Sequence, residues 1–209
     1  MQALRLRLQE PLPGKKAHAL MASSDRLKDA YYAKRLLAFK RHSAVLVLLY
    51  PFLHDINTLL IRRTADSGPH SGQVGFPGGK IEPTDAGAAA AALREAREEL
   101  GIECSAIEVL GQLTPVYIPV SDQVVCPVVA FSTVLQELRP NPQEVAYVVH
   151  LRCADLIQPQ RRKRGVFSAA GGLVISAPYF DISGEQIWGA TALILSELAC
   201  LLYPGMLAS

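Results

Sequence analysis

Apolar residues along the chain follow two periods, and the changes between them divide the sequence into strands and helices. Short, mostly apolar runs bounded by Gly, Pro, Asn or Asp predict strands. These runs cover residues 44–49, 58–61, 107–113, 123–131 and 145–151, and a hairpin covers 166–180 with Gly171 and Gly172 near its middle. Helical spacing covers residues 25–40, 154–157 and 185–202. This order of elements predicts an α/β fold with a mixed sheet between helices.

One further predicted helix carries three glutamates on one side. Glu95, Glu98 and Glu99 are spaced i, i+3 and i+4, so they share a face beside the apolar arc that contains Leu93 and Leu100. Like charges at this spacing repel, and the repulsion grows where the effective dielectric is low. The cluster predicts a bound cation, and carboxylate oxygens suit Mg²⁺ or Mn²⁺. A solvated acidic face with internal Arg–Glu pairs is the plain alternative.

A glycine-rich turn precedes this helix and favours the metal interpretation. The sequence FPGG at residues 76–79 fits neither a helix nor a central strand, and its two glycines let the backbone approach a ligand closely. Thr84 or Asp85 is expected to cap the helix, and Gly101 stands where a left-handed residue would end it. Together these segments predict a loop–helix–loop that binds metal and phosphate.

Residues 79–102 resemble the Nudix box, the loop–helix–loop of hydrolases that act on nucleoside diphosphate derivatives. The sequence REAREELGI, from Arg94 to Ile102, fits the family pattern REUxEExGU at every fixed position. The first half departs from the pattern, because Asp85 holds the position of the first box glutamate and lies one residue further from Arg94 than usual. The resemblance implies that the fold is the Nudix α/β/α sandwich.

The same Asp and the same extra residue occur in the coenzyme A diphosphatase branch of that family. LLIRR at residues 59–63 and HSGQVGFPGG at 70–79 resemble the branch motif LLxxR…HxGQxxFPGG, and Ser67 departs from it where Leu is usual. NPQEV at 141–145 and IWGAT at 187–191 resemble NPxEV and IWGxT. The resemblance extends over about residues 40–200. It implies metal-dependent cleavage of coenzyme A or its thioesters to 3′,5′-ADP and a 4′-phosphopantetheine product.

The resemblance also implies metal ligands. Glu98 and Glu99 are the first choices, Glu95 is a ligand or a base, and the Gly78 carbonyl completes the set. Metals that bridge phosphate oxygens neutralise the diphosphate charge and lower the pKa of a bound water. Arg94 is expected to hold Glu95 in place by a charge-assisted pair.

An acid outside the helix is common in this family as a ligand or base. Glu144 is the preferred candidate, ahead of Glu82, and its plain alternative is an ordinary acid before a strand.

Residues expected to contact the substrate lie upstream of the helix. They are Arg62, Arg63, His70 and Gly79. Strand alternation directs one of Arg62 and Arg63 to the site and the other to solvent, without deciding which. The plain alternative for His70 is a loop residue without a role in binding.

Two further groups have a structural and a functional interpretation. Trp188 and Phe76 could stack on a base, but single aromatics beside apolar neighbours are usually core, and we expect packing. The basic run at residues 161–164 could bind the 3′-phosphate of coenzyme A. Four cations followed by Gly165 are more typical of a solvated hairpin loop, which is the expectation here.

Composition limits the classes of partner. A formal net charge of +2 is too small for electrostatic capture of a nucleic acid. No apolar run is long enough to span a bilayer, so the 50% hydrophobic content predicts a buried sheet and a homodimer face. The four scattered cysteines and the absence of an apolar signal at the amino terminus predict a cytoplasmic protein.

The chain length of 209 residues fits one domain with a short extension. We expect an N-terminal extension with a helix at residues 1–40, packed on a Nudix domain at residues 41–209. The leading hypothesis is a coenzyme A diphosphatase. The alternatives are a Nudix hydrolase for ADP-ribose, a dinucleotide or an oxidised nucleoside triphosphate, and a non-catalytic Nudix ligand-binding module. Such modules typically lose box glutamates, which this chain retains.

Overall fold

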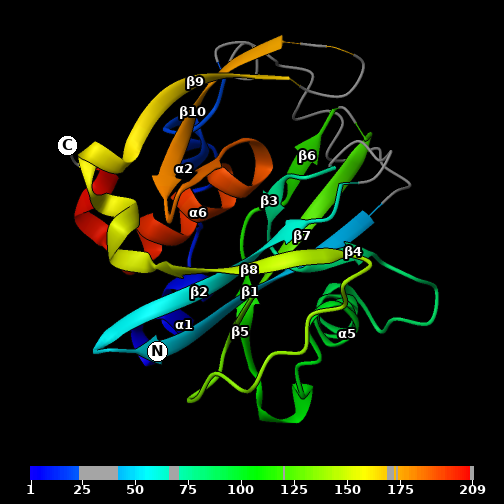
Figure 1. Ribbon diagram of the computed structural model, residues 1–209. Coiled ribbons are helices and arrows are strands. Elements are labelled where there is room, and N and C mark those ends of the chain that lie inside the picture. The colour runs from blue at the N-terminus through cyan, green and yellow to red at the C-terminus, as the bar shows by residue number, and fades with distance from the viewer. Residues whose placement is uncertain (24–41, 66–70, 120, 169–171, 173, 208–209) are drawn as a thin grey trace.

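The computed structural model describes residues 1–23, 42–65, 71–119, 121–168, 172 and 174–207 (Figure 1). The helix predicted at residues 25–40 lies outside the described residues, and so does the predicted boundary between residues 40 and 41.

An eight-stranded mixed sheet forms the centre of the fold. Its strands are β1 (His42–Phe52), β2 (Asp55–Arg63), β3 (Val74–Gly75), β4 (Gly78–Lys80), β5 (Glu108–Gln112), β6 (Val116–Ile118), β7 (Gln123–Phe131) and β8 (Val145–Arg152). β1 runs parallel to β7 and antiparallel to β2. Further along, β4 pairs with the start of β1 and β3 with the end of β2. Phe76 and Pro77 therefore connect two short strands, and Gly78 and Gly79 belong to β4, which lies off the main path of the sheet, so residues 76–79 form neither a helix nor a central strand, as expected.

The two faces of the sheet bury two separate cores. Along β1, Leu46 and Leu48 belong to the core beneath helix α5 (Ala88–Leu100). Val47 and Leu49 point the other way, into the core beneath helix α6 (Gly189–Leu202). Alternate side chains of a strand point to opposite faces, so an almost continuous apolar run can serve both cores. Figure 1 shows α5 and α6 on opposite sides of the sheet, which confirms the predicted α/β/α sandwich.

A second, three-stranded sheet lies beside the first near the carboxyl end. It contains β9 (Arg162–Ser168), β10 (Val174–Ile182) and β11 (Glu185–Ile187), so the predicted hairpin is present. The short 3₁₀ helices are η1 (Cys104–Ala106), η2 (Cys153–Ile157), η3 (Pro159–Arg161) and η5 (Pro204–Leu207).

Two expectations for this region are wrong. The closing helix begins at Gly189 and not at residue 185, because Glu185–Ile187 pairs with β10 across a tight turn at Ser183 and Gly184. The basic run is not a loop: Arg162 to Arg164 lie on β9 and pair with β10.

The amino-terminal segment packs on α6 through a buried glutamate. Helices α1 (Gln2–Gln9) and α2 (Gly14–Ala19) both contact α6. Glu197 on α6 has no exposed surface and accepts hydrogen bonds from the Gly14 N–H and from Thr114, while the His18 ring lies 3.2 Å away. In the described part of the chain, no helix combines the length and apolarity needed to cross a membrane.

Candidate active site

Helix α5 holds the glutamate cluster against the sheet. Its alanines pack in the core shared with β1, with Ala91, Ala92 and Ala96 fully buried. The helix ends at Gly101, which has a φ of 68° and accepts this left-handed conformation without a Cβ clash, as predicted. The predicted caps are wrong, because the N-cap residue is Gly87 and makes no side-chain hydrogen bond.

The Asp85 carboxylate contacts Arg94 instead of capping the helix. Arg94 donates from Nε to Oδ1 at 3.1 Å and from Nη2 to Oδ2 at 3.0 Å. The hydrogen bonds from Arg94 lower the pKa of Asp85. Arg94 also donates to Glu95 at 3.0 Å, to Glu98 at 3.1 Å and to the Lys80 carbonyl at 3.0 Å. One guanidinium thus orients two of the helix glutamates and the loop before the helix.

Glu99 is the most buried member of the cluster, with 1% of its surface exposed. It accepts a hydrogen bond from the Gly78 N–H at 2.8 Å, and Arg63 Nη1 lies 3.4 Å from its other oxygen. Burial raises the pKa of Glu99 to about 7, and the charges of Glu95 and Glu144 add to this shift. The Gly78 N–H and Arg63 oppose this rise without cancelling it, so the chain itself only partly compensates the buried charge.

Glu95 lies directly against the glycine turn. A Cβ placed on Gly79 would be 2.5 Å from all three carboxyl atoms of Glu95, so a larger residue here would displace the Glu95 carboxylate from its position. Burial raises the pKa of Glu95, Arg94 opposes the shift, and the charges of Glu98 and Glu144 reinforce it.

Glu144 comes from outside the helix and reaches the same cluster. Its backbone is fixed before β8, where its N–H donates to the Asn141 carbonyl at 3.1 Å and its carbonyl accepts from the Thr64 N–H at 3.0 Å. The charge of Glu144 raises the pKa of both Glu95 and Glu99. Glu98, with 51% of its side chain exposed, completes a set of four carboxylates of graded burial.

The donor set fits a divalent cation. Among the described residues, no three His, Cys, Asp or Glu side chains are already arranged as a metal cage. Arg94 Nη1 contacts both Glu95 and Glu98. The ligating atoms on offer are all carboxylate oxygens, which Mg²⁺ and Mn²⁺ prefer. A cation would also stabilise the ionised form of buried Glu99.

The structure separates the two arginines that alternation could not assign. Arg63 reaches Glu99, whereas Arg62 donates to Glu185 at 2.8 Å. Gly79 lies beside Glu95, and His70 lies outside the described residues. Sequence reasoning missed the contact between Asp85 and Arg94, because these residues have no helical spacing to indicate it.

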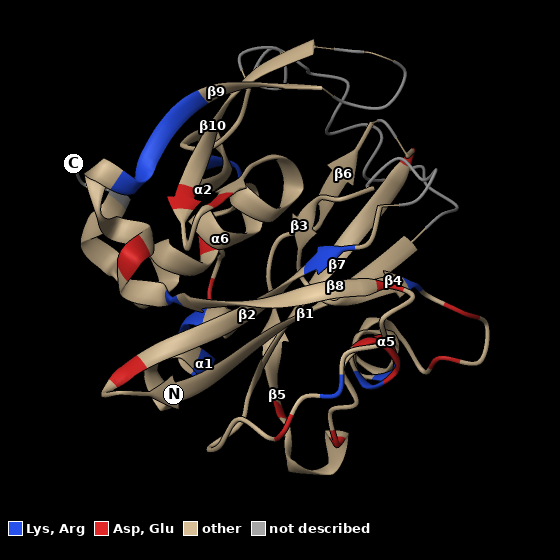
Figure 2. Cartoon of the chain, viewed as in Figure 1, with Lys and Arg blue, Asp and Glu red and all other residues tan. Residues whose placement is uncertain are grey.

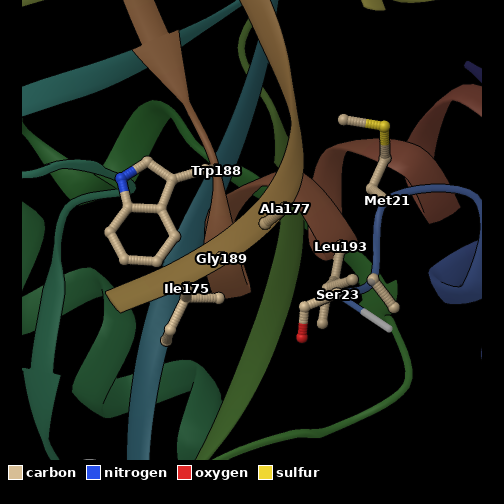
Figure 3. A pocket seen from close by; sticks show the side chains of 8 residues that line it. Met21, Ser23, Ile175, Ala177, Trp188, Gly189 and Leu193 are labelled. Carbon is tan, nitrogen blue, oxygen red and sulfur yellow. The ribbon is translucent and has the colours of Figure 1, made fainter. Parts of the chain in front are cut away.

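The two aromatic residues pack as expected. Trp188 stacks on Phe167, with ring centroids 4.6 Å apart and planes at 9°, and Phe76 is 5% exposed in the core. Trp188 also lines an apolar cavity of about 60 Å³ with Met21, Ile175 and Leu193 (Figure 3). This cavity lies on the α6 face of the sheet and contains none of the clustered glutamates.

Comparison with known proteins identifies the family of the chain. The NUDIX domain profile matches residues 40–170. The mitochondrial coenzyme A diphosphatase NUDT8 of Homo sapiens is 40% identical over 175 residues, which are 82% of this chain and 73% of that protein.

A bacterial relative and a solved structure extend the comparison. The uncharacterized Nudix hydrolase NudL of Escherichia coli K12 is 40% identical over 68% of this chain and 72% of its own length. The MutT protein of Methanosarcina mazei superposes with a TM-score of 0.50 at 17% identity, over 76% of this chain and 91% of that protein, and supports the fold alone. The chain therefore belongs to the Nudix hydrolase family and is similar, within it, to the coenzyme A diphosphatases.

Proposed function

We propose that this protein is a metal-dependent hydrolase that cleaves the diphosphate linkage of coenzyme A and its thioesters. The observation that carries the proposal is the carboxylate cluster around Glu99, built on the Nudix helix beside the glycine turn. The similarity to a mitochondrial coenzyme A diphosphatase over 82% of this chain supports coenzyme A as the substrate. The products would be 3′,5′-ADP and a 4′-phosphopantetheine derivative.

Glu98 and Glu99 would hold Mg²⁺ or Mn²⁺ together with the Gly78 carbonyl, and Glu95 would be either a further ligand or the base. When bound, the metal would supply positive charge that offsets the diphosphate and acidifies a coordinated water. The chain itself sets the positions of the ligands: Gly78 fixes Glu99, and Arg94 fixes Glu95 and Glu98. Partners of this kind orient ligands and tune their basicity.

The attacking water must lose a proton as its oxygen bonds to phosphorus and the bridging oxygen leaves. Burial raises the pKa of Glu95, which makes its carboxylate a better proton acceptor near neutral pH. Glu144 is the alternative acceptor, because its charge acts on the same cluster from β8. Arg63, which reaches Glu99 in the structure, would contact the substrate phosphates.

The test is a substrate panel read by product mass spectrometry. The full chain with Mg²⁺ or Mn²⁺ is expected to convert coenzyme A to 3′,5′-ADP and 4′-phosphopantetheine, and EDTA is expected to stop the reaction. If coenzyme A stays intact while ADP-ribose, a dinucleotide or an oxidised nucleoside triphosphate is cleaved, the proposed substrate is wrong, but the proposed hydrolase activity is correct.

The Glu98→Gln variant tests whether the cluster is the metal site. Glu98 is half exposed, so this change should leave the fold intact while removing one carboxylate ligand. Full activity in Glu98→Gln would contradict the assigned site, and no hydrolysis of any panel member by the wild type would favour a ligand-binding module. A cytoplasmic location and a homodimer stay predictions.

A further inference from the structure

Arg62 and Arg63 lie next to each other at the end of β2 and point to different faces of the sheet. Arg63 contacts the carboxylate cluster through Glu99 on the α5 face. Arg62 lies on the α6 face and contacts Glu185 of β11. The pairing between β2 and β8 shifts register between these two arginines, so the strand is irregular at this point. Irregular pairing of this kind often redirects a side chain near a functional site.

Glu185 holds two partners at once. It is 8% exposed, and one oxygen accepts from Arg62 Nη1 at 2.8 Å while the other accepts from the Tyr147 hydroxyl. Arg62 and Tyr147 are direct cross-strand neighbours on β2 and β8. The anion is therefore buried and the two groups that it orients face outward, with 37% of the Arg62 side chain and 49% of Tyr147 exposed.

This arrangement fits a phosphorylated nucleoside. An exposed phenol ring whose hydroxyl is already fixed offers a flat surface for a base at little cost in rotamer entropy. A guanidinium that uses one nitrogen on a carboxylate keeps further N–H donors for phosphate oxygens. Base stacking beside an arginine is a common form of nucleotide recognition.

The position of the pair suits a substrate whose diphosphate occupies the carboxylate cluster. Arg62 pairs with Val74 of β3, and the chain continues from there into the glycine turn that holds Glu95 and Glu99. Arg63 at the cluster and Arg62 on the other face are adjacent in the chain, so a nucleoside that extends from the diphosphate around the end of β2 would meet Arg62 and Tyr147. We propose that Arg62 and Tyr147, braced by Glu185, bind the phosphorylated nucleoside end of the substrate, with Arg62 on the 3′-phosphate.

Two members of the basic run at residues 161–164 already have partners, and the run lies away from this position. Lys163 is paired with Asp181, and Arg161 donates to the Asp181 carbonyl at 3.4 Å. Figure 2 shows the basic stretch of β9 and the glutamates of α5 on opposite sides of the molecule, whereas the blue end of β2 lies between them.

The test measures nucleotide binding to the full chain by calorimetry, with adenosine 3′,5′-bisphosphate and 5′-AMP as probes. The wild type should prefer the bisphosphate by about 10-fold, as one charge-assisted contact predicts. Arg62→Ala should remove this preference. Arg152→Ala is the matched control, because Arg152 is also half exposed and paired with carboxylates, at the far end of β8.

Variants of Tyr147 test whether its ring stacks on the nucleobase. Tyr147→Ala should weaken both nucleotides by about 10-fold through lost stacking, whereas Tyr147→Phe, which loses only the contact to Glu185, should weaken them less. Tyr147 is exposed, so these variants remain informative even if Arg62→Ala fails to fold.

The proposal is overturned if the wild type shows no preference, if Arg62→Ala keeps it, or if Tyr147→Ala binds as the wild type does. The subsite rests on the proposed function, and the two can fail separately. Cleavage of coenzyme A without a preference for the 3′-phosphate would reject the subsite alone, whereas the preference without cleavage would reject the diphosphatase activity alone.

Discussion

Two buried glutamates on opposite faces of the same sheet have opposite environments. Glu197 on α6 accepts hydrogen bonds from the Gly14 N–H at 2.9 Å and from the Thr114 N–H and hydroxyl at 3.0 and 2.7 Å. Burial acts to raise the pKa of Glu197, but His18, Thr114 and Gly14 together hold it below its usual value. Glu99 on α5 is equally buried, yet it has one backbone donor and one arginine at 3.4 Å, and its pKa rises.

The difference separates a structural carboxylate from one that is available to a ligand. Both groups carry the cost of removing a charge from water. At Glu197 the donors come from the chain itself and join the amino-terminal segment to the domain. At Glu99 the Gly78 N–H and Arg63 lower the pKa, but burial and the charges of Glu95 and Glu144 outweigh them, so a bound cation would add compensation that the chain does not complete. The degree of internal pairing thus distinguishes the two roles where burial alone does not.

The largest expected effect is the loss of activity in Glu99→Gln. Gln is isosteric and neutral, so the helix and its packing should persist while the charged metal ligand is lost. Mutation of a residue that hydrogen-bonds to a metal ligand lowers metal affinity or activity by about 10–100-fold. Loss of the ligand itself should therefore lower kcat/KM by more than about 100-fold. Steady-state assays with coenzyme A over a range of Mg²⁺ concentrations measure this change.

Glu197→Gln is the matched control for Glu99→Gln. It removes a charge of equal burial from the other face of the sheet. At a temperature where it stays folded, its kcat/KM should be within about twofold of the wild type, because Glu197 contacts none of the clustered acids. Equal losses in the two variants would show that burial, and not ligand binding, determines the effect.

A pH difference follows from the raised pKa of Glu99 in the metal-free protein. Between the usual glutamate pKa of 4.5 and the raised pKa of about 7, the folded state keeps a proton on Glu99 that the unfolded state releases. The stabilisation by protonated Glu99 is thus complete below 4.5 and is lost as the pH rises through about 7, a change of about 3 kcal/mol. Urea unfolding in EDTA at pH 5 and pH 8 should show this loss in the wild type.

Glu99→Gln isolates the contribution of this one carboxyl group to the pH dependence. The variant cannot titrate at this position, so its stability should fall less over the same range. An identical pH dependence in both proteins would mean that Glu99 ionises normally. Added Mg²⁺ should recover stability at pH 8 in the wild type, because a bound cation favours the ionised carboxylate.

Local patterns predicted most of the sandwich. The strand at Gln123–Phe131 and the end of α5 at Gly101 matched the structure, because apolar runs and left-handed glycines act within a few residues. The expectations that were wrong depended on distant partners. Glu185–Ile187 continues a helical pattern in sequence, yet it pairs with β10, and no local signal carries that information.

The site shows the same limit at the level of single side chains. The i, i+3, i+4 spacing placed Glu95, Glu98 and Glu99 together because a helix fixes their geometry. Alternation could separate Arg62 from Arg63 but not assign them, because the choice depends on where α5 and β11 pack against the sheet. The partner of Asp85 was equally hidden, since a loop has no fixed period.

The smallest of these effects is the stability cost of Glu197→Gln. The Gln amide can keep some of the contacts, but its NH₂ group faces donors at Gly14 and Thr114 and leaves them poorly paired. An unsatisfied buried group costs about 1–3 kcal/mol, so we expect a loss of about 2 kcal/mol at pH 7. Because the lowered pKa of Glu197 stabilises the fold above its unfolded value and this contribution fades as the pH falls, the difference should shrink on acidification. Chemical denaturation at pH 7 and pH 4, with the exposed Glu103→Gln as control, measures both changes, and a constant difference would show that the Glu197 pairing does not depend on its charge.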